Sequence, residues 1–203
     1  MAAISSRSPG HSENAVALGG GSNAIPASGV ALLSHEPALW IRSIHASAAW
    51  DSVGALMLDY RLDADLGSLR IPRTGAGERI DGLWHHTCFE AFVQGCDAPA
   101  YREFNFSPSG AWQAYAFSDY RQGGPLALSA APRIECAGAG AGVLRLSALV
   151  SPPGLPPGRR LRLGLSAVLE SEAGKLSYWA LAHPPGRPDF HHTGGFALEL
   201  VRP

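Results

Sequence analysis

The sequence predicts an all-β protein built as an antiparallel β-sandwich of about ten strands. From Leu32 onward, short runs of alternating apolar and polar residues are separated by Gly, Pro, Asn or Asp, a pattern typical of β-strands. No window of 15 residues shows sustained helical periodicity. About ten strands in one twisted sheet would leave an apolar face in water, so we expect two packed sheets.

Each expected strand is an alternating run that ends at a turn residue. In Val53–Leu62 the apolar side carries Leu56, Leu58, Tyr60 and Leu62, as one face of a strand should. In chain order, the expected strands are Leu39–His45, Val53–Leu62, Leu83–Gln94, Tyr101–Phe106, Ala111–Phe117, Ile134–Cys136, Leu144–Val150, Leu161–Leu169, Leu176–Ala182 and Phe196–Val201.

Two predicted turns set the pairing of three neighbouring strands. Ser107–Gly110 has Pro at its second and Gly at its fourth position, as a type I turn prefers. With the loop Gly95–Ala100 it forms a meander that places Glu90 opposite Asn105, and Asn105 beside Gln113. The sequence therefore predicts a polar strip across three strands, away from the core.

Two interpretations of this strip are open. It is either the solvated face of a half-buried sheet or a hydrogen-bonding platform for a polar ligand such as a sugar. Glu103, His86 and Tyr115 fall near it, and Trp84, Trp112 and Trp179 could add flat surfaces for stacking. A Trp in a sandwich is otherwise a core residue.

The segment His183–His192 is dense in ionisable residues and stiffened by three prolines. By default we expect Asp189 to pair with Arg187 while a histidine bonds the loop backbone. A divalent metal bound by His183, His191 and His192, with Asp189 assisting, is a weaker alternative because the spacing fits no standard motif. A third alternative is a binding rim shared with His85 and His86.

Net charge, hydropathy and cysteine content narrow the class of protein. A net charge of −1 disfavours nucleic-acid or membrane-surface binding, and no apolar run approaches the roughly 20 residues of a membrane span. Three cysteines are compatible with a reducing compartment, so we expect a soluble, cytoplasmic protein. Residues 1–30, rich in Gly, Ser and Ala, predict a disordered tail before a domain over residues 31–203.

Catalytic motifs are lacking. The sequence contains no G-x-S-x-G, P-loop or H-E-x-x-H, and Glu90 and Glu103 as a glycosidase pair have nothing to fix their separation. We therefore expect no enzymatic activity.

Two motifs resemble those of the DOMON-like superfamily, close to the family-9 carbohydrate-binding modules, and most of all a bacterial DOMON-like subgroup. The pattern Y-x-E-F-x-x-x-P-x-G is present in Tyr101–Gly110, and Trp84, Glu90 and Phe92 match a W-x-x-D-x-x-E-x-F strand. His and Thr stand where acidic residues are common, which weighs against the family's calcium sites.

The resemblance implies a jelly-roll-like sandwich that binds sugars or haem. Haem-binding members use Met and His as axial ligands, which here would pair Met57 with His183 or His86. We expect a non-catalytic module for a saccharide-like small molecule, without a cofactor. A haem-binding redox module and a protein-interaction domain are the alternatives. The predicted ligand-binding residues are His86, Glu90, Glu103, Asn105, Gln113, Tyr115, Trp179, His183, Arg187, Asp189 and His191.

Overall fold

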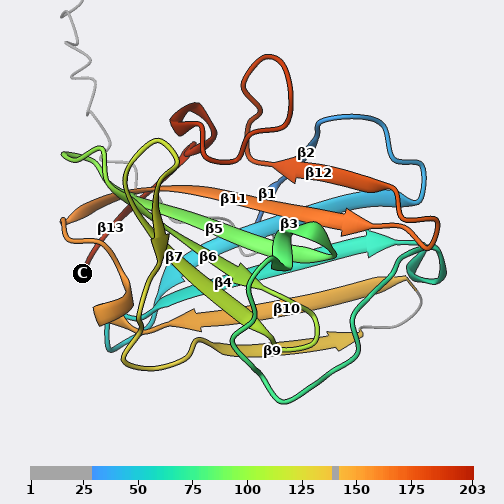
Figure 1. The fold of residues 1–203 in the computed structure, drawn as a ribbon, viewed down its shortest axis with the longest axis horizontal. Coiled ribbons are helices and arrows are strands. Elements are labelled where there is room, and N and C mark those ends of the chain that lie inside the picture. Colours follow the sequence, from blue (N-terminus) through green and yellow to red (C-terminus); the bar gives the residue numbers. More distant parts are fainter. Residues whose placement is uncertain (1–28, 139–141) are drawn as a thin grey trace, which may run out of the picture.

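The structure is a computed structural model, and it describes residues 29–138 and 142–203 (Figure 1). Two antiparallel sheets lie face to face, which confirms the predicted β-sandwich. The described residues form thirteen strands rather than about ten. The expected tail covers residues 1–30, of which 1–28 lie outside the described residues.

One sheet has five strands in the order β1-β3-β4-β10-β9. Their bounds are β1 Val30–Ala31, β3 Ile41–Trp50, β4 Leu56–Ala64, β10 Val143–Val150 and β9 Arg133–Gly138. The central strands β3, β4 and β10 pair in continuous antiparallel register over most of their length. This sheet closes one side of the sandwich core.

The other sheet has eight strands and carries the predicted polar strip. Its order is β2-β12-β11-β5-β6-β7-β8, with β13 also paired to β11. The bounds are β2 Leu33–Ser34, β12 Leu176–Ala180, β11 Arg160–Glu170, β5 Cys88–Gly95, β6 Tyr101–Phe106, β7 Trp112–Asp119, β8 Gln122–Pro125 and β13 Leu198–Val201.

Three of the strands were not expected from the sequence. Strands β1 and β2 have two residues each, and β8 has the sequence QGGP, so none is long or regular enough to show alternation. The expected strand Leu83–Gln94 begins instead with a 3₁₀ turn, η2 (Leu83–His85), after Gly82 in the left-handed region at φ 75°. The other 3₁₀ turns are η1 Leu66–Ser68, η3 Pro152–Gly154 and η4 Thr193–Gly195.

The main core lies between the sheets, on the faces that alternation assigned. Leu56, Leu58 and Leu62 of β4 are fully buried in it, and each buried leucine stabilises the fold by about 1.5–3 kcal/mol. Trp112 and Trp179 are also buried in this core. The prediction that they offer stacking surfaces to a ligand, and with it Trp179 as a site residue, is therefore wrong. Each occupies a core-facing position of its strand.

A second, smaller apolar cluster lies on the outer face of the eight-stranded sheet. Phe92, Tyr101 and Phe196 are buried there, with Phe117 and Phe190 packed against them. Phe190 and Phe196 belong to the connection between β12 and β13, the red loops at the top of Figure 1. Both faces of the sheet are thus covered near β5 and β6.

Close approach of this loop requires a glycine on β11. A Cβ built on Gly164 would lie 2.8 Å from Cδ1 and 3.3 Å from Cε1 of Phe196. Both distances are shorter than ordinary van der Waals contact, so Gly164 lets the Phe196 ring lie directly on the strand.

Replacing Gly164 with Val should destabilise the protein by about 1–3 kcal/mol, as overpacking does. The expected cause is displacement of Phe196 from Phe92. Urea unfolding measures the effect, and Gly124→Val is the matched control because no atom lies within 4 Å of a Cβ at that strand position. Equal losses in the two variants would contradict the role given to this contact.

Candidate functional site

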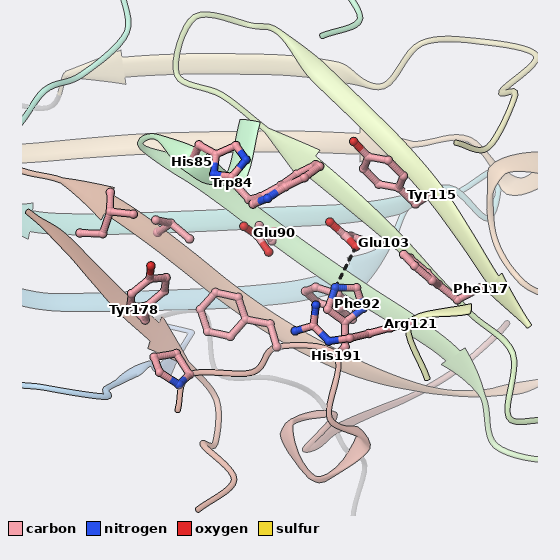
Figure 2. Close-up of a pocket in the computed structure, with 14 residues that line it drawn as sticks. Trp84, His85, Glu90, Phe92, Glu103, Tyr115, Phe117, Arg121, Tyr178 and His191 are labelled. Carbon is pink, nitrogen blue, oxygen red and sulfur yellow. Dashed lines mark ion pairs between the residues drawn. The ribbon is translucent and has the colours of Figure 1, made fainter. Parts of the chain in front are cut away.

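A cavity of about 510 Å³ opens on the outer face of the eight-stranded sheet, a size typical of small-molecule sites. Strands supply its floor, and loops supply its walls (Figure 2). The floor residues are Glu90, Phe92, Glu103, Tyr115, Phe117, Val168, Leu176 and Tyr178; the wall residues are Trp84, His85, Arg121, Pro188, Phe190 and His191.

The polar strip has the predicted register but not the exposure of a solvated face. Glu90 pairs with Asn105, and Asn105 pairs with Gln113. Glu90 is 2% exposed, Glu103 5% and Asn105 0%. The solvated-face interpretation is therefore wrong, because loops cover this face. The alternation of apolar and polar residues along a strand gives no sign of such loops.

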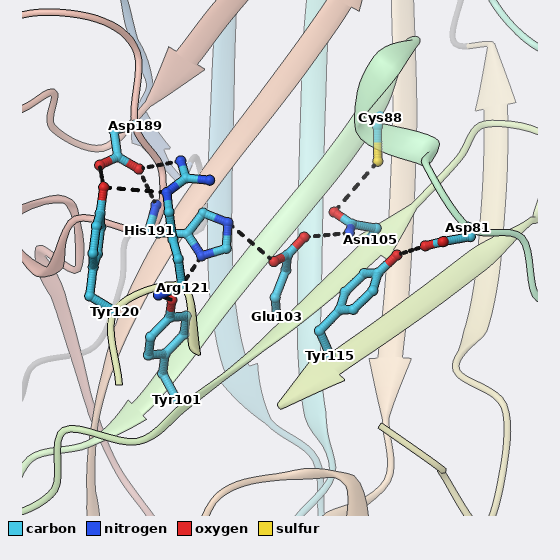
Figure 3. Close-up of polar contacts among 10 residues, drawn as sticks. All are labelled: Asp81, Cys88, Tyr101, Glu103, Asn105, Tyr115, Tyr120, Arg121, Asp189 and His191. Atoms are coloured by element: carbon cyan, nitrogen blue, oxygen red, sulfur yellow. Dashed lines mark hydrogen bonds and ion pairs between the residues drawn. The ribbon is translucent and has the colours of Figure 1, made fainter. Parts of the chain in front are cut away.

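Only part of the strip reaches the cavity. Asn105 lies beneath it and donates from Nδ2 to Glu103 Oε1 at 2.6 Å, so it orients that carboxyl (Figure 3). Gln113 accepts from Arg79 Nε at 2.7 Å and thereby fastens the loop that precedes η2. Glu90, Glu103 and Tyr115 line the cavity.

The two floor carboxyls are held away from water and close to each other. Burial, and then the charge of Glu103, raise the pKa of Glu90 well above its usual range. Burial raises the pKa of Glu103 to about 7, although the Asn105 hydrogen bond and the Arg121 charge oppose this. Because the two groups interact, they release their protons as a pair.

His191 is neutral at pH 7. Burial, and then the charge of Arg121, lower its pKa to about 4. Its Nδ1 lies 2.8 Å from the Tyr101 hydroxyl, which accepts the backbone N–H of Arg121 and so has its proton free to donate to Nδ1. The ring proton then lies on Nε2, which faces Glu103 Oε2 at 3.6 Å.

Asp189 holds this wall in place, with a partner that differs from the predicted one. It accepts from Arg121 Nη2 at 2.8 Å and from the Tyr120 hydroxyl at 2.7 Å, as Figure 3 shows. The expected pair with Arg187 is wrong: Arg187 is exposed and lies outside the cavity. Asp189 and Arg121 stand 68 residues apart in sequence, so local spacing could not reveal their pairing.

The other predicted histidines have separate partners. His86 Nδ1 lies 2.7 Å from Glu170 Oε2, and His183 Nε2 lies 2.8 Å from the Leu33 carbonyl oxygen. His85, not His86, shares the cavity with His191. The shared rim is thus formed with one of the two histidines named for it. Over residues 29–138 and 142–203, no group of three or more His, Cys, Asp or Glu is placed to hold a metal ion.

The haem ligands implied by the family resemblance do not converge. Met57 is 37% exposed and alternates with the core residues Leu56 and Leu58, so it points outward from the five-stranded sheet. His86 and His183 contact residues of the eight-stranded sheet or its neighbouring loop. The sandwich core separates Met57 from both, and these residues do not fit a haem.

Several cavity residues were not among the predicted site residues: Trp84, Phe92, Phe117, Arg121, Tyr178 and Phe190. Phe92 and Tyr178 occupy outward-facing positions in the alternating pattern of their strands, so this pattern could have identified them. No sequence pattern indicated Arg121, because its position depends on a turn in which it has the unusual φ of 54°.

Comparison with known proteins shows a shared fold. The chain superposes on the crystal structure of a "putative carbohydrate-binding protein" from Bacteroides uniformis with a TM-score of 0.59, 16% identity and coverage of 78% of each chain. No protein-family model matches the sequence, and neither does any curated protein. Within the described residues, no helix has the length and apolarity needed to cross a membrane.

The stability of the protein should depend on pH through Glu103. Its pKa is 4.5 ordinarily and about 7 in the fold, so between these values the folded state holds a proton that the unfolded state has lost. The Glu103 contribution to stability is therefore greatest below pH 4.5 and falls as the pH rises to about 7. The lowered pKa of His191 acts in the opposite direction between about pH 4 and 6.5.

Replacing Glu103 with Gln removes its titration. The free energy of unfolding of the variant minus that of wild type should rise from pH 4.5 to about 7 and then level off. Urea unfolding at four pH values measures it, with Glu135→Gln, an exposed acid of β9, as control. A difference independent of pH would show that Glu103 titrates normally in the folded protein.

Proposed function

We propose that this cavity binds a saccharide or a sugar derivative without transforming it. The observation that carries the proposal is a pair of carboxyls set among aromatic side chains. Glu90 and Glu103 face the cavity from the sheet, while Trp84, Tyr178 and Phe190 border it. A sugar ring complements this lining, because its hydroxyl groups can bond to the carboxyls and its flat C–H faces can pack on the aromatic rings.

Part of the aromatic lining is preorganised. The rings of Trp84 and Tyr115 meet edge to face with centroids 5.5 Å apart, a favoured geometry. The Tyr115 hydroxyl in turn donates to Asp81 Oδ1 in the loop before η2. A ring fixed in this way loses little conformational entropy when a ligand stacks on it, which favours binding.

Two further observations support the proposal. The Bacteroides uniformis protein of similar fold is described as carbohydrate-binding. Trp84, Glu90 and Glu103, which carry the resemblance to DOMON-like and family-9 modules, all line the cavity. Membership of the DOMON-like superfamily is part of this proposal.

A panel of mono- and disaccharides should identify a ligand by its effect on melting temperature. At one hundred times Kd, binding adds about 2.7 kcal/mol, or roughly 5–10 °C for a chain of this size. Trp84→Ala should abolish the shift by removing a wall. Trp50→Ala is the control, because Trp50 ends β3 of the five-stranded sheet, its indole N–H donates to the Val201 carbonyl oxygen, and it does not line the cavity.

No shift with any sugar in wild type would argue against the proposal and in favour of an interaction domain. Incubation of the binding sugars, as aryl glycosides, should release no phenol. Release that depends on Glu90 and Glu103 would contradict binding without chemistry and indicate a glycosidase.

A further inference from the structure

Polar atoms at and beside the floor of the cavity are left without partners by the protein. Oε1 of Glu90, which lines the cavity, is buried and has no hydrogen-bond partner among the described residues. Ser166 does not line the cavity but lies directly opposite Glu90 on the adjacent strand, and its buried Oγ lacks a partner in the same way. Leaving buried polar groups unpaired costs about 1–3 kcal/mol each, and more for a charged group, so a ligand that pairs with them has free energy to gain.

The ionisable groups around this floor are mostly carboxyls. Besides Glu90 on β5 and Glu103 on β6, Asp81 and Asp189 approach from the two covering loops. Arg121 in the β7–β8 turn supplies a guanidinium, but Asp189 already accepts its hydrogen bond at 2.8 Å. The floor carboxyls therefore have no dedicated cationic partner within the described chain.

The remaining titratable groups near the floor do not supply positive charge at neutral pH. His191 on the covering loop is neutral, since its pKa is about 4. Cys88 on β5, Tyr60 on β4, Tyr101 on β6 and Tyr115 on β7 have raised pKa values and stay protonated. Tyr178 of β12 and the exposed His85 complete the lining.

Resting on the proposed function, we propose that the preferred ligand is an amino sugar, whose protonated amine lies against Glu90 and Glu103. An ammonium group donates three hydrogen bonds, and the two carboxyls that line the cavity can accept them. The sugar ring itself would contact Trp84.

This ligand class has a distinctive pH dependence. Without ligand, the floor pair retains protons near neutral pH because ionised carboxyls are costly there. A bound ammonium favours the ionised carboxylates, so binding must release protons into the buffer. Affinity for the amino sugar should therefore fall as the pH drops from 7 to 5, whereas affinity for a neutral sugar should change little.

Matched methyl glycosides test the inference. The 2-amino, 2-acetamido and 2-hydroxy forms of the gluco, galacto and manno series differ at one substituent. By isothermal titration at pH 7, an amino form should bind about 10- to 100-fold more tightly than its two neutral partners, the worth of a hydrogen bond to a charged group. Titration in buffers of different ionisation enthalpy should show proton release for the amino form.

Two variants assign the preference to the floor. In Glu90→Gln the amino form should bind no more than about threefold more tightly than its two neutral partners, so the ratio of these affinities is the readout. Glu135→Gln on the other sheet should keep both affinities. Melting without ligand shows whether Glu90→Gln folds; should it fail to fold, Glu103→Gln provides the same comparison.

The outcomes separate the two proposals. If neutral sugars bind as tightly as amino sugars, or amino sugars bind without releasing protons, the amino-sugar inference is overturned and saccharide binding stands. If none of the nine glycosides binds, the amino-sugar inference is overturned, and if no sugar of the wider panel binds either, both proposals are overturned.

Discussion

The site depends on the small aromatic cluster outside the main core. Phe92 and Tyr101 point outward from the eight-stranded sheet, and Phe196 packs on them from the β12–β13 connection. The rings of Phe92 and Phe196 stack with centroids 5.9 Å apart, and Gly164 leaves room for this approach. Burial of this apolar surface holds the loop over the sheet.

Once the loop is held there, its polar residues have little freedom. Asp189 is fixed between Arg121 and Tyr120, and His191 between Tyr101 and Glu103. These bonds place an imidazole and a guanidinium at the edge of the cavity. They also exclude water from the strip beneath, so the same packing that builds the wall raises the pKa of both floor carboxyls.

The two faces of the eight-stranded sheet therefore differ: one stabilises the fold, and the other carries polar groups without partners. The inner face of the eight-stranded sheet packs against β3, β4 and β10, and the outer face carries buried acids that the protein itself does not neutralise. Buried polar groups without partners destabilise a folded protein, so they are expected mainly where they serve a function. Their presence in a preformed cavity is the physical basis for the proposal that this face binds a ligand.

Much of this arrangement could be predicted from local sequence patterns, but contacts between distant segments could not. The two turns fixed the register of β5, β6 and β7, so the pairs Glu90–Asn105 and Asn105–Gln113 were confirmed. Burial of the strip and the Arg121 partner of Asp189 were missed. For Trp112 and Trp179 the core alternative was correct and the stacking one was not. The short β1, β2 and β8 carry too few residues to form a recognisable pattern.

The sequence by itself determined the longer strands, their faces and the identity of the acid and amide groups on one of those faces. Those features follow from the two-residue repeat of an extended chain and from turn residues a few positions apart. Only the tertiary structure decided that loops from distant parts of the chain would cover that face. Contacts such as Tyr101–His191, separated by 90 residues, depend on how the sheets fold together, and no local spacing encodes them.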